Sequence, residues 1–348
     1  MAQLVAHLHG MERVRGSNPL SSTIGRLPER FGSLFSLPFP VGFRAIRGSD
    51  AKTKKARTMI DEVLFLRHGR TAYNLARRLQ GQIDIPLDIV GRWQADQSAY
   101  ELAKTYYWAK VAHLAEHNDQ LAQPAYGNAH LADVDEINNA PAAARRMLVV
   151  SSDLFRAQQT AHAFADLMGL DVELDPRLRE RSFGEWEGMT REEICEHYAD
   201  DYHSWRAHTG GETKHGVESR IHTGRRGAEA VRDIVAKHHD ETMPTTLLLV
   251  GHGSWIVATV AVLLDMDPDD LNNVGAMRNA FWTRMTPHTD PRNADRPTWK
   301  LEEFNQGPAI ASFADWENGP ESLRAPGMPL WKPIIQYTAP KTSSKVNS

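Results

Sequence analysis

The stretch LRHGRTAYN (residues 66–74) follows an apolar run, DEVLFL (61–66), and this junction determines how the rest of the chain is interpreted. The run is typical of a buried strand, and a helix is expected from Thr71 onward. The strand delivers Arg67 and His68 into a loop, where ligands bind in open α/β sheets. A guanidinium can bind a phosphate while a neutral imidazole attacks phosphorus, although a lone histidine at a strand end is more often structural.

A second strand end repeats this arrangement far along the chain. TTLLLVGHGSW (245–255) is again an apolar run, and it ends in the pair His252 and Gly253. In a parallel sheet the carboxyl ends of two such strands meet at one edge, so we expect the two histidines to converge.

Two further segments supply an arginine and a carboxylate. SSDLFRAQQTA (151–161) places Arg156 at the start of a predicted helix, and LRERSFGEWEGMT (178–190) places Glu180 in a glycine-rich loop. An arginine at a helix start opposes the helix dipole, which favours a bound anion over a plain surface residue. Two histidines, two arginines and a carboxylate together are the groups that phosphoryl transfer without a metal requires.

Strands and helices alternate through the body of the chain. LVVSS (148–152) and LDVEL (170–174) predict strands, and the segments 225–239 and 254–264 predict helices. The helix after Ser151 carries an apolar stripe that Gly169 ends. This alternation predicts an α/β fold of three layers, a mostly parallel central sheet with helices on both faces.

Charge and composition divide the chain into a basic leader and an acidic body. Residues 1–58 carry ten Lys or Arg and three Asp or Glu, a net of +7, so the remainder carries −11. The leader resembles a transit peptide, a basic nucleic-acid-binding tail, or the translated end of a transfer-RNA gene with a start set too far upstream; we favour the last, with Met59 as the natural beginning. A single folded domain is expected over 59–340, with an insertion at 104–145 and a flexible tail at 341–348.

The motifs together resemble the histidine phosphatase superfamily, also called phosphoglycerate mutase-like, from about Val63 to Trp282. Among its members the chain is most similar to the actinobacterial glucosyl-3-phosphoglycerate phosphatases. The resemblance is carried by the RHG loop with Asn74 after it, RLQGQIDIPLD (78–88), SSDLFRAQQTA, LRERSFGEWEG, GGETKHGVESR (210–220), VGHG (250–253), and the late stretch from Asn279 to Thr283.

The resemblance implies a role for each candidate residue. His68 attacks phosphorus and becomes a phosphohistidine, while Arg67, Arg156 and His252 stabilise the equatorial oxygens. Glu180 protonates the leaving oxygen and then deprotonates water, unless it is an ordinary ion-pair partner of Arg179 or Arg181.

The predicted substrate side of the pocket is formed by Asn74 as a neutral donor, by the backbone at Gln80 and Gly81, and by Gly253. Arg70 departs from the family pattern, and it either contacts a second anionic group of the substrate or lies in solvent.

The function expected from this set is a metal-independent phosphomonoesterase that acts on a small phosphorylated metabolite. A cofactor-dependent phosphoglycerate mutase and a non-catalytic phospholigand-binding protein are the alternatives. No cofactor is expected, and a solvated surface is favoured over a metal site for His113 and His117. Neither nucleic acid nor membrane is an expected partner, a cytoplasmic location is expected, and the oligomeric state stays open, with a homodimer among the alternatives.

Overall fold

The computed structural model describes residues 60–106, 145–238, 244–271, 273–290, 293–324 and 330. All of them belong to one compact unit, Lys54–Ser348. The predictions for the leader 1–58, for most of the insertion at 104–145, for His113 and His117, and for the tail 341–348 lie outside the described residues.

The centre of this unit is one mixed sheet. Its strands are β1 (Ile60–Arg67), β2 (Arg146–Ser151), β3 (Val172–Leu174), β4 (Thr245–Gly251), β5 (Trp282–Asp290) and β6 (Asn293–Gln306). They lie in the order β3-β2-β4-β1-β5-β6. The first four in this order are parallel, whereas β5 joins β1 and β6 joins β5 in antiparallel pairs.

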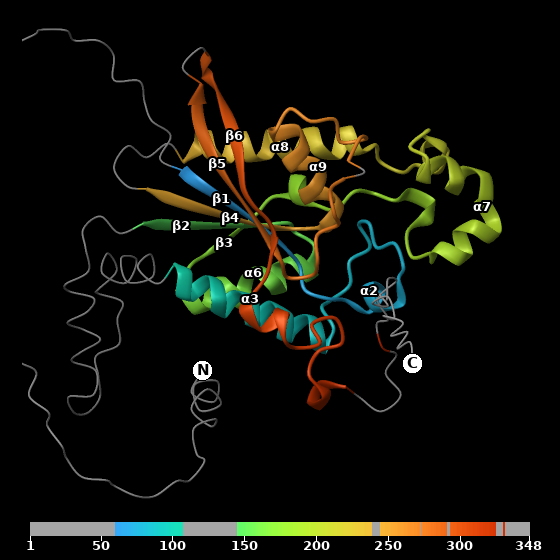
Figure 1. The fold of residues 1–348 in the computed structure, drawn as a ribbon, viewed down its shortest axis with the longest axis horizontal. Coiled ribbons are helices and arrows are strands. Elements are labelled where there is room, and N and C mark those ends of the chain that lie inside the picture. Colours follow the sequence, from blue (N-terminus) through green and yellow to red (C-terminus); the bar gives the residue numbers. More distant parts are fainter. Residues whose placement is uncertain are drawn as a thin grey trace, which may run out of the picture. The chain divides into compact units, whose positions relative to one another are not determined.

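Helices cover both faces of the sheet, as predicted (Figure 1). The α-helices are α2 (Ala72–Ala76), α3 (Ile89–Thr105), α6 (Phe155–Met168), α7 (Arg191–Arg206), α8 (Arg220–Lys237) and α9 (Gly253–Leu263). Short 3₁₀ helices span η3 (Pro176–Leu178), η4 (Gly184–Trp186), η5 (Gly211–His215), η6 (Ala309–Ser312) and η7 (Glu321–Leu323). On one face α3 and α6 cover the sheet, and on the other α8 and α9 do so.

Alternation along the central strands divides the core in two. Phe65 of β1 and Leu249 of β4 pack with α8 and α9, whereas Leu66 and Leu248 pack with α3 and α6. Because both faces are buried, the strand sequences are nearly continuous in apolar residues, which is why the sequence predicted them well. A third, smaller cluster lies around Trp186 and α7.

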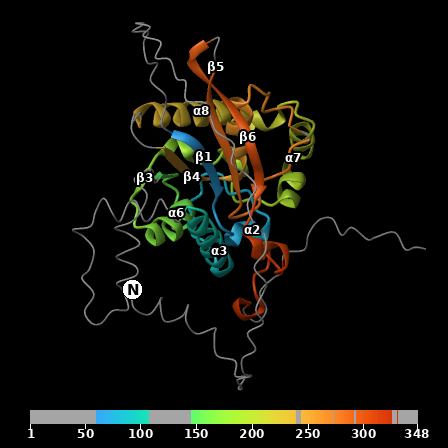
Figure 2. The ribbon, with the colours of Figure 1, turned by 60° about the vertical axis from the view of Figure 1, so that its left-hand side comes forward.

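The C-terminal part differs from the sequence-based expectation. Figure 2 shows β5 and β6 as a long hairpin at the edge of the sheet, which the pattern did not predict. Each strand contains a proline, Pro287 or Pro297, and prolines weaken a strand prediction. Trp299 and Trp316 of this part of the chain are both buried.

Candidate active site

Two parallel neighbours, β1 and β4, bring the two histidines together. Arg67 pairs with Gly251 at the carboxyl ends of these strands, and the next residue on each side is a histidine. The ring centroids of His68 and His252 lie 5.1 Å apart. Both rings are buried. The predicted convergence at one edge of the sheet is confirmed.

His68 has one nitrogen committed to a hydrogen bond. Its Nδ1 lies 2.7 Å from the carbonyl oxygen of Gly69. A carbonyl oxygen can only accept, so Nδ1 carries the proton and Nε2 keeps a free lone pair. Burial, and then the positive charges of Arg156 and Arg67, hold the pKa of His68 well below its ordinary value. The imidazole is therefore neutral and is ready to act as a nucleophile.

His252 is oriented by a residue that the sequence did not single out. Its Nε2 lies 2.9 Å from Ser152 Oγ, at the end of β2. Its Nδ1 is buried and has no hydrogen-bond partner among the described residues. Burial, Arg156 and His68 lower the pKa of His252 well below its ordinary value. Neutral His252 carries a single ring proton. It can therefore donate to a bound anion only from the nitrogen that holds this proton.

Two guanidinium groups flank the histidines, that of Arg156, which is fully buried, and that of Arg67, which is partly buried. Arg156, the second residue of α6, donates to the carbonyls of Ile83 and Gly81 at 2.8 and 2.7 Å. Burial lowers its pKa to about 10, which leaves it charged at neutral pH. Because Arg156 is fully buried, the alternative that it is a surface residue is wrong. Its Nε has no partner among the described residues and can donate to an anion.

Arg67 is held in a similar way. Its guanidinium donates to the carbonyl of Met277, and its Nε is buried without a partner in the described part of the chain. Burial lowers the pKa of Arg67, and the nearby charge of Glu180 opposes this effect. Gly253 lies against this side chain, since a Cβ there would be 3.2 Å from Arg67 Nε. The first residue of α9 thus leaves room for the guanidinium.

Asn74 is fixed through its amide oxygen. Its Oδ1 accepts from the backbone N–H of Thr71 at 3.1 Å and from Nδ2 of Asn279 at 3.2 Å. With the oxygen satisfied, Nδ2 of Asn74 is the group that can act as the predicted neutral donor. Asn279 also donates to the carbonyl of His68 at 3.1 Å. Asn279 thereby braces the loop that follows β1, although it lies over two hundred residues away in sequence.

Glu180 lies at the N-terminus of α9 rather than in an ion pair. Its Oε1 accepts from the backbone N–H groups of Arg181 and Trp255 at 2.8 and 2.9 Å, and its Oε2 accepts from Ser254 N at 3.2 Å. The alternative of an ion pair with Arg179 or Arg181 is wrong, because those arginines pair with Asp153 and Glu212. Oε2, which accepts only one of these hydrogen bonds, is the oxygen with room for a proton.

The loop after α2, which contains Gln80 and Gly81, lies beside the site. The carbonyl of Gly81 accepts from Arg156, which puts this backbone beside the site. Gly81 adopts φ of +52°, and a Cβ there would lie 2.0 Å from Glu187 Oε1, so only glycine fits. The side chain of Gln80 is buried and accepts from the hydroxyl of Thr71.

Arg70 requires a correction. The expectation that it lies in solvent is wrong, because only 2% of its side chain is exposed. Its Nε donates to Asp88 at 2.8 Å, and another nitrogen donates to the carbonyl of Glu317 at 2.6 Å. These contacts connect the loop that follows β1 to Asp88, at the start of α3, and to Glu317 in the C-terminal part of the chain. A contact between Arg70 and the substrate stays a prediction, and its Nη2 is buried without a hydrogen-bond partner among the described residues.

The residues that sequence reasoning missed are those that orient others: Gly69, Ser152, Thr160 and Asn279. Thr160 Oγ1 accepts from the backbone N–H of Gly69 at 3.1 Å. All four lie in motifs quoted above, but none of them was predicted to have an orienting role. Gly69 neighbours His68, whereas Ser152, Thr160 and Asn279 contact partners 91 to 211 positions away, so no local pattern identifies them.

Within the described ranges, no group of three His, Cys, Asp or Glu side chains is arranged to hold a metal ion. Among the described helices, none has the length and apolar character that crossing a bilayer demands. The arrangement offers a neutral imidazole nucleophile, several cationic or neutral donors, and one carboxyl group, which together suit the transfer of a phosphoryl group.

Comparison with known proteins agrees with this chemistry. A family profile described as the histidine phosphatase superfamily, branch 1, matches residues 63–113 and 135–300. A glucosyl-3-phosphoglycerate phosphatase of Mycolicibacterium vanbaalenii is 32% identical over 260 residues, which cover 73% of this chain and 98% of that protein. A probable phosphoglycerate mutase of Yersinia enterocolitica is 30% identical over 235 residues, which cover 66% of this chain and 86% of that protein. A solved mycobacterial glucosyl-3-phosphoglycerate phosphatase, complexed with VO₃, matches at a TM-score of 0.53 with 30% identity, over 71% of this chain and all of that one.

Proposed function

This chain belongs to branch 1 of the histidine phosphatase superfamily, and from that premise we propose that it hydrolyses a phosphomonoester through a phosphohistidine formed on His68. One observation carries the proposal. The Gly69 carbonyl fixes the proton of His68 on Nδ1, which leaves Nε2 as a free nucleophile beside Arg67 and Arg156.

The proposed first step transfers the phosphoryl group to the enzyme. Nε2 of His68 forms a bond to phosphorus while the bond to the leaving oxygen breaks, and the proton on Glu180 Oε2 moves to that oxygen. Arg67, Arg156 and His252 stabilise the charge on the equatorial oxygens. Asn74 adds an amide N–H.

The proposed second step regenerates the enzyme. The Glu180 carboxylate takes a proton from a water molecule whose oxygen attacks phosphorus, and the P–N bond to His68 breaks. Inorganic phosphate is released, and Glu180 is again protonated. The chain needs no metal for either step, since its own cations balance the charge of the phosphoryl group.

The proposed substrate class is a phosphosugar or a phosphoglycerate derivative, with glucosyl-3-phosphoglycerate as the first compound to test. Support comes from the mycobacterial relatives, whose names state this substrate and which align along almost their full length. The buried arginines explain affinity for the phosphoryl group but do not distinguish one alcohol from another.

A phosphoglycerate mutase is the second candidate, because a probable enzyme of this kind also matches the chain. A mutase must hold a bisphosphate and must transfer the phosphoryl group from the histidine to a phosphoglycerate hydroxyl instead of to water. Between η4 and α7 only residues 187–190 intervene, and α7 begins with an acidic turn that contains Glu192 and Glu193. This segment adds no cluster of positive charge for a second phosphate, so hydrolysis is favoured.

A phosphate-release screen over a panel of phosphomonoesters, run with and without 2,3-bisphosphoglycerate, separates the two candidates. We expect phosphate release from glucosyl-3-phosphoglycerate or a related ester without the bisphosphate. Isomerisation that depends on the bisphosphate and releases no phosphate would replace the hydrolase proposal with the mutase.

A further inference from the structure

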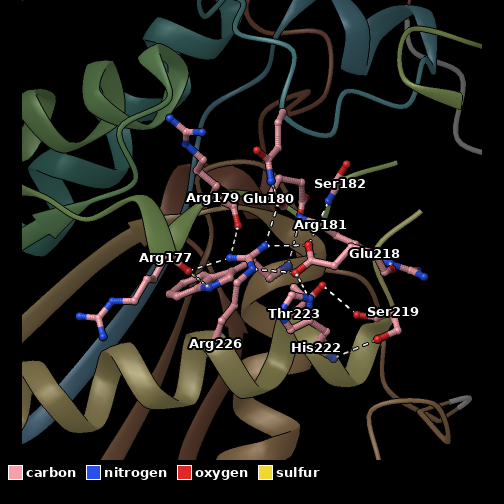
Figure 3. Close-up of polar contacts among 12 residues, drawn as sticks. Arg177, Arg179, Glu180, Arg181, Ser182, Glu218, Ser219, His222, Thr223 and Arg226 are labelled. Atoms are coloured by element: carbon pink, nitrogen blue, oxygen red, sulfur yellow. Dashed lines mark hydrogen bonds and ion pairs between the residues drawn. The ribbon is translucent and has the colours of Figure 1, made fainter. Parts of the chain in front are cut away.

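Arg226 of α8 lies beside the loop that carries Glu180 and binds the backbone of that segment (Figure 3). Its guanidinium donates to the carbonyl oxygens of Arg177 at 2.7 Å, Arg179 at 2.8 Å and Glu180 at 3.0 Å. Arg177, in η3, and Arg179 and Glu180, in the loop 179–183, belong to no strand, so these carbonyls have no sheet partner. Arg226 supplies one.

Glu218 holds Arg226 in place and also reaches the loop. Its two carboxylate oxygens accept from Arg226 at 2.8 and 3.0 Å. The same carboxylate accepts from Ser182 N at 3.1 Å, and Glu218 N donates to Ser182 O at 2.9 Å (Figure 3). Burial raises the pKa of Glu218, but Arg226 outweighs this and the net shift is downward, so the pair stays charged.

The side-chain chemistry of position 226 is specific to arginine. A guanidinium has five N–H donors in a planar fork, and the five hydrogen bonds of Arg226 use that number. Lysine has three donors and no fork, so it can satisfy only part of this set. The loop is therefore fixed on the α8 side by one side chain.

Glu180 is held from two directions as a consequence. Its carbonyl is bound by Arg226, and its carboxylate is bound by the first N–H groups of α9. Fixing the backbone of Glu180 fixes where its carboxyl group meets the leaving oxygen, and a misplacement of about 1 Å can cost roughly a hundredfold in rate.

We propose that Arg226, held by Glu218, is a positioning residue that sets the carboxyl group of Glu180 for proton donation to the leaving oxygen. The inference rests on the acid role proposed for Glu180. If this is so, substituting Arg226 should lower kcat/KM by a factor that depends on the leaving group of the substrate. An alkoxide needs a proton in order to leave, whereas p-nitrophenolate leaves without one.

The experiment measures kcat/KM for an alkyl phosphate and for p-nitrophenyl phosphate, since this ratio covers only the steps up to release of the alcohol. The variants are Arg226→Met, Arg226→Lys, Glu218→Gln and Glu180→Gln. Arg145→Gln is the control, because it breaks an ion pair with Asp61 at the amino end of β1, away from the site. We expect Arg226→Met to lower kcat/KM roughly a hundredfold for the alkyl ester and less than about threefold for the aryl ester.

The other variants complete the comparison. Arg226→Lys and Glu218→Gln should show the same selectivity with smaller losses, and the control should leave both substrates unaffected. Equal losses on the two substrates in Arg226→Met would mean that Arg226 only supports the fold, and would overturn the proposal. If this variant does not fold, Arg226→Lys decides by the same criterion.

Glu180→Gln separates the two levels of the argument. A selective loss in Glu180→Gln with no selectivity in the Arg226 variants would overturn the positioning role alone. A loss in Glu180→Gln that is equal on the two substrates would remove the proposed acid, and the positioning role with it.

Discussion

Individual residues in the site combine buried positive charge with histidines that stay neutral. Arg67 and Arg156 each donate hydrogen bonds from terminal guanidinium nitrogens to backbone carbonyls. The Nε of each is buried and has no partner among the described residues. Their charge also lowers the pKa of His68 and His252. In the proposed mechanism the same two arginines bind the phosphoryl group and keep His68 unprotonated, which couples binding to reactivity.

Substituting the two histidines should separate their roles. His68→Ala should abolish turnover and any acid-labile phosphoryl label trapped from a radiolabelled substrate, because no second group can form the bond to phosphorus. His252→Ala should slow turnover by roughly 10²–10³-fold and still form the label, because it stabilises charge without bonding to phosphorus. A stable label on the His68→Ala protein would mean that the nucleophile is misassigned.

At the level of elements, the quality of prediction followed the type of burial. β1, β4, α6 and α9 were predicted from apolar runs and helical periodicity, because both faces of the parallel strands and most of α9 are buried. The β5–β6 hairpin was not predicted, since it lies at the edge and both strands contain proline. Parallel order, rather than any local signal, is what brings these strand ends together.

The candidate site divides in the same way. Residues on strand ends and their adjoining loops, such as His68, Glu180 and His252, could be predicted because a motif marks each of them. Ser152 and Asn279 could not, because each acts on a partner 100 or 211 positions away, and only the folded chain shows the contact.

The loop that follows β1 packs closely against Gly91 of α3, and this contact gives a prediction for Gly91. A Cβ on Gly91 would lie 1.8 Å from the carbonyl oxygen of Arg70, and one on Gly69 would lie 2.2 Å from the carbonyl oxygen of Gly91. Alanine is normally better than glycine inside a helix by about 1 kcal/mol, but overpacking here should cost roughly 1–3 kcal/mol and displace the loop. We expect Gly91→Ala to lower both the Tm and kcat.

The matched control for this change is Gly275→Ala. No heavy atom lies within 4 Å of a Cβ built there, and its φ is not in the left-handed region. Its Tm and kcat should stay close to those of the original chain. An active and equally stable Gly91→Ala protein would show that the contact between the loop and α3 can relax without consequence.

For the whole molecule, the two buried histidines make folding sensitive to acid. The pKa values of His68 and His252 in the folded chain lie well below 6.5, their ordinary value. Below that pH the two histidines bind protons in the unfolded chain but stay neutral in the folded chain. The free energy of unfolding should therefore fall as the pH drops from 6.5. His215, whose pKa is raised chiefly by Asp201, acts in the opposite direction: its contribution is lost as the pH rises above 6.5.

Denaturant titrations between pH 7 and pH 5 check this prediction. The decline should be clearly smaller in a His68→Ala, His252→Ala double variant, which lacks the two groups that resist protonation. An identical decline in the two proteins would place the acid sensitivity elsewhere, among the carboxylates.

The balance of charge over the molecule leads to the last prediction. The chain has a net charge of −4, so its attraction for a phosphate comes from the local group of Arg67, Arg156 and the site's neutral donors rather than from the overall field. These cations remain when metals are removed, and EDTA should therefore leave kcat unchanged. Vanadate can adopt a five-coordinate geometry beside His68 Nε2, so it should compete with substrate and bind more tightly than phosphate. His68→Ala should lose most of that preference for vanadate, because the fifth ligand is gone. An enzyme that EDTA silences and Mg²⁺ or Zn²⁺ restores would contradict this mechanism, since its phosphate would then be bound through a metal held by carboxylates.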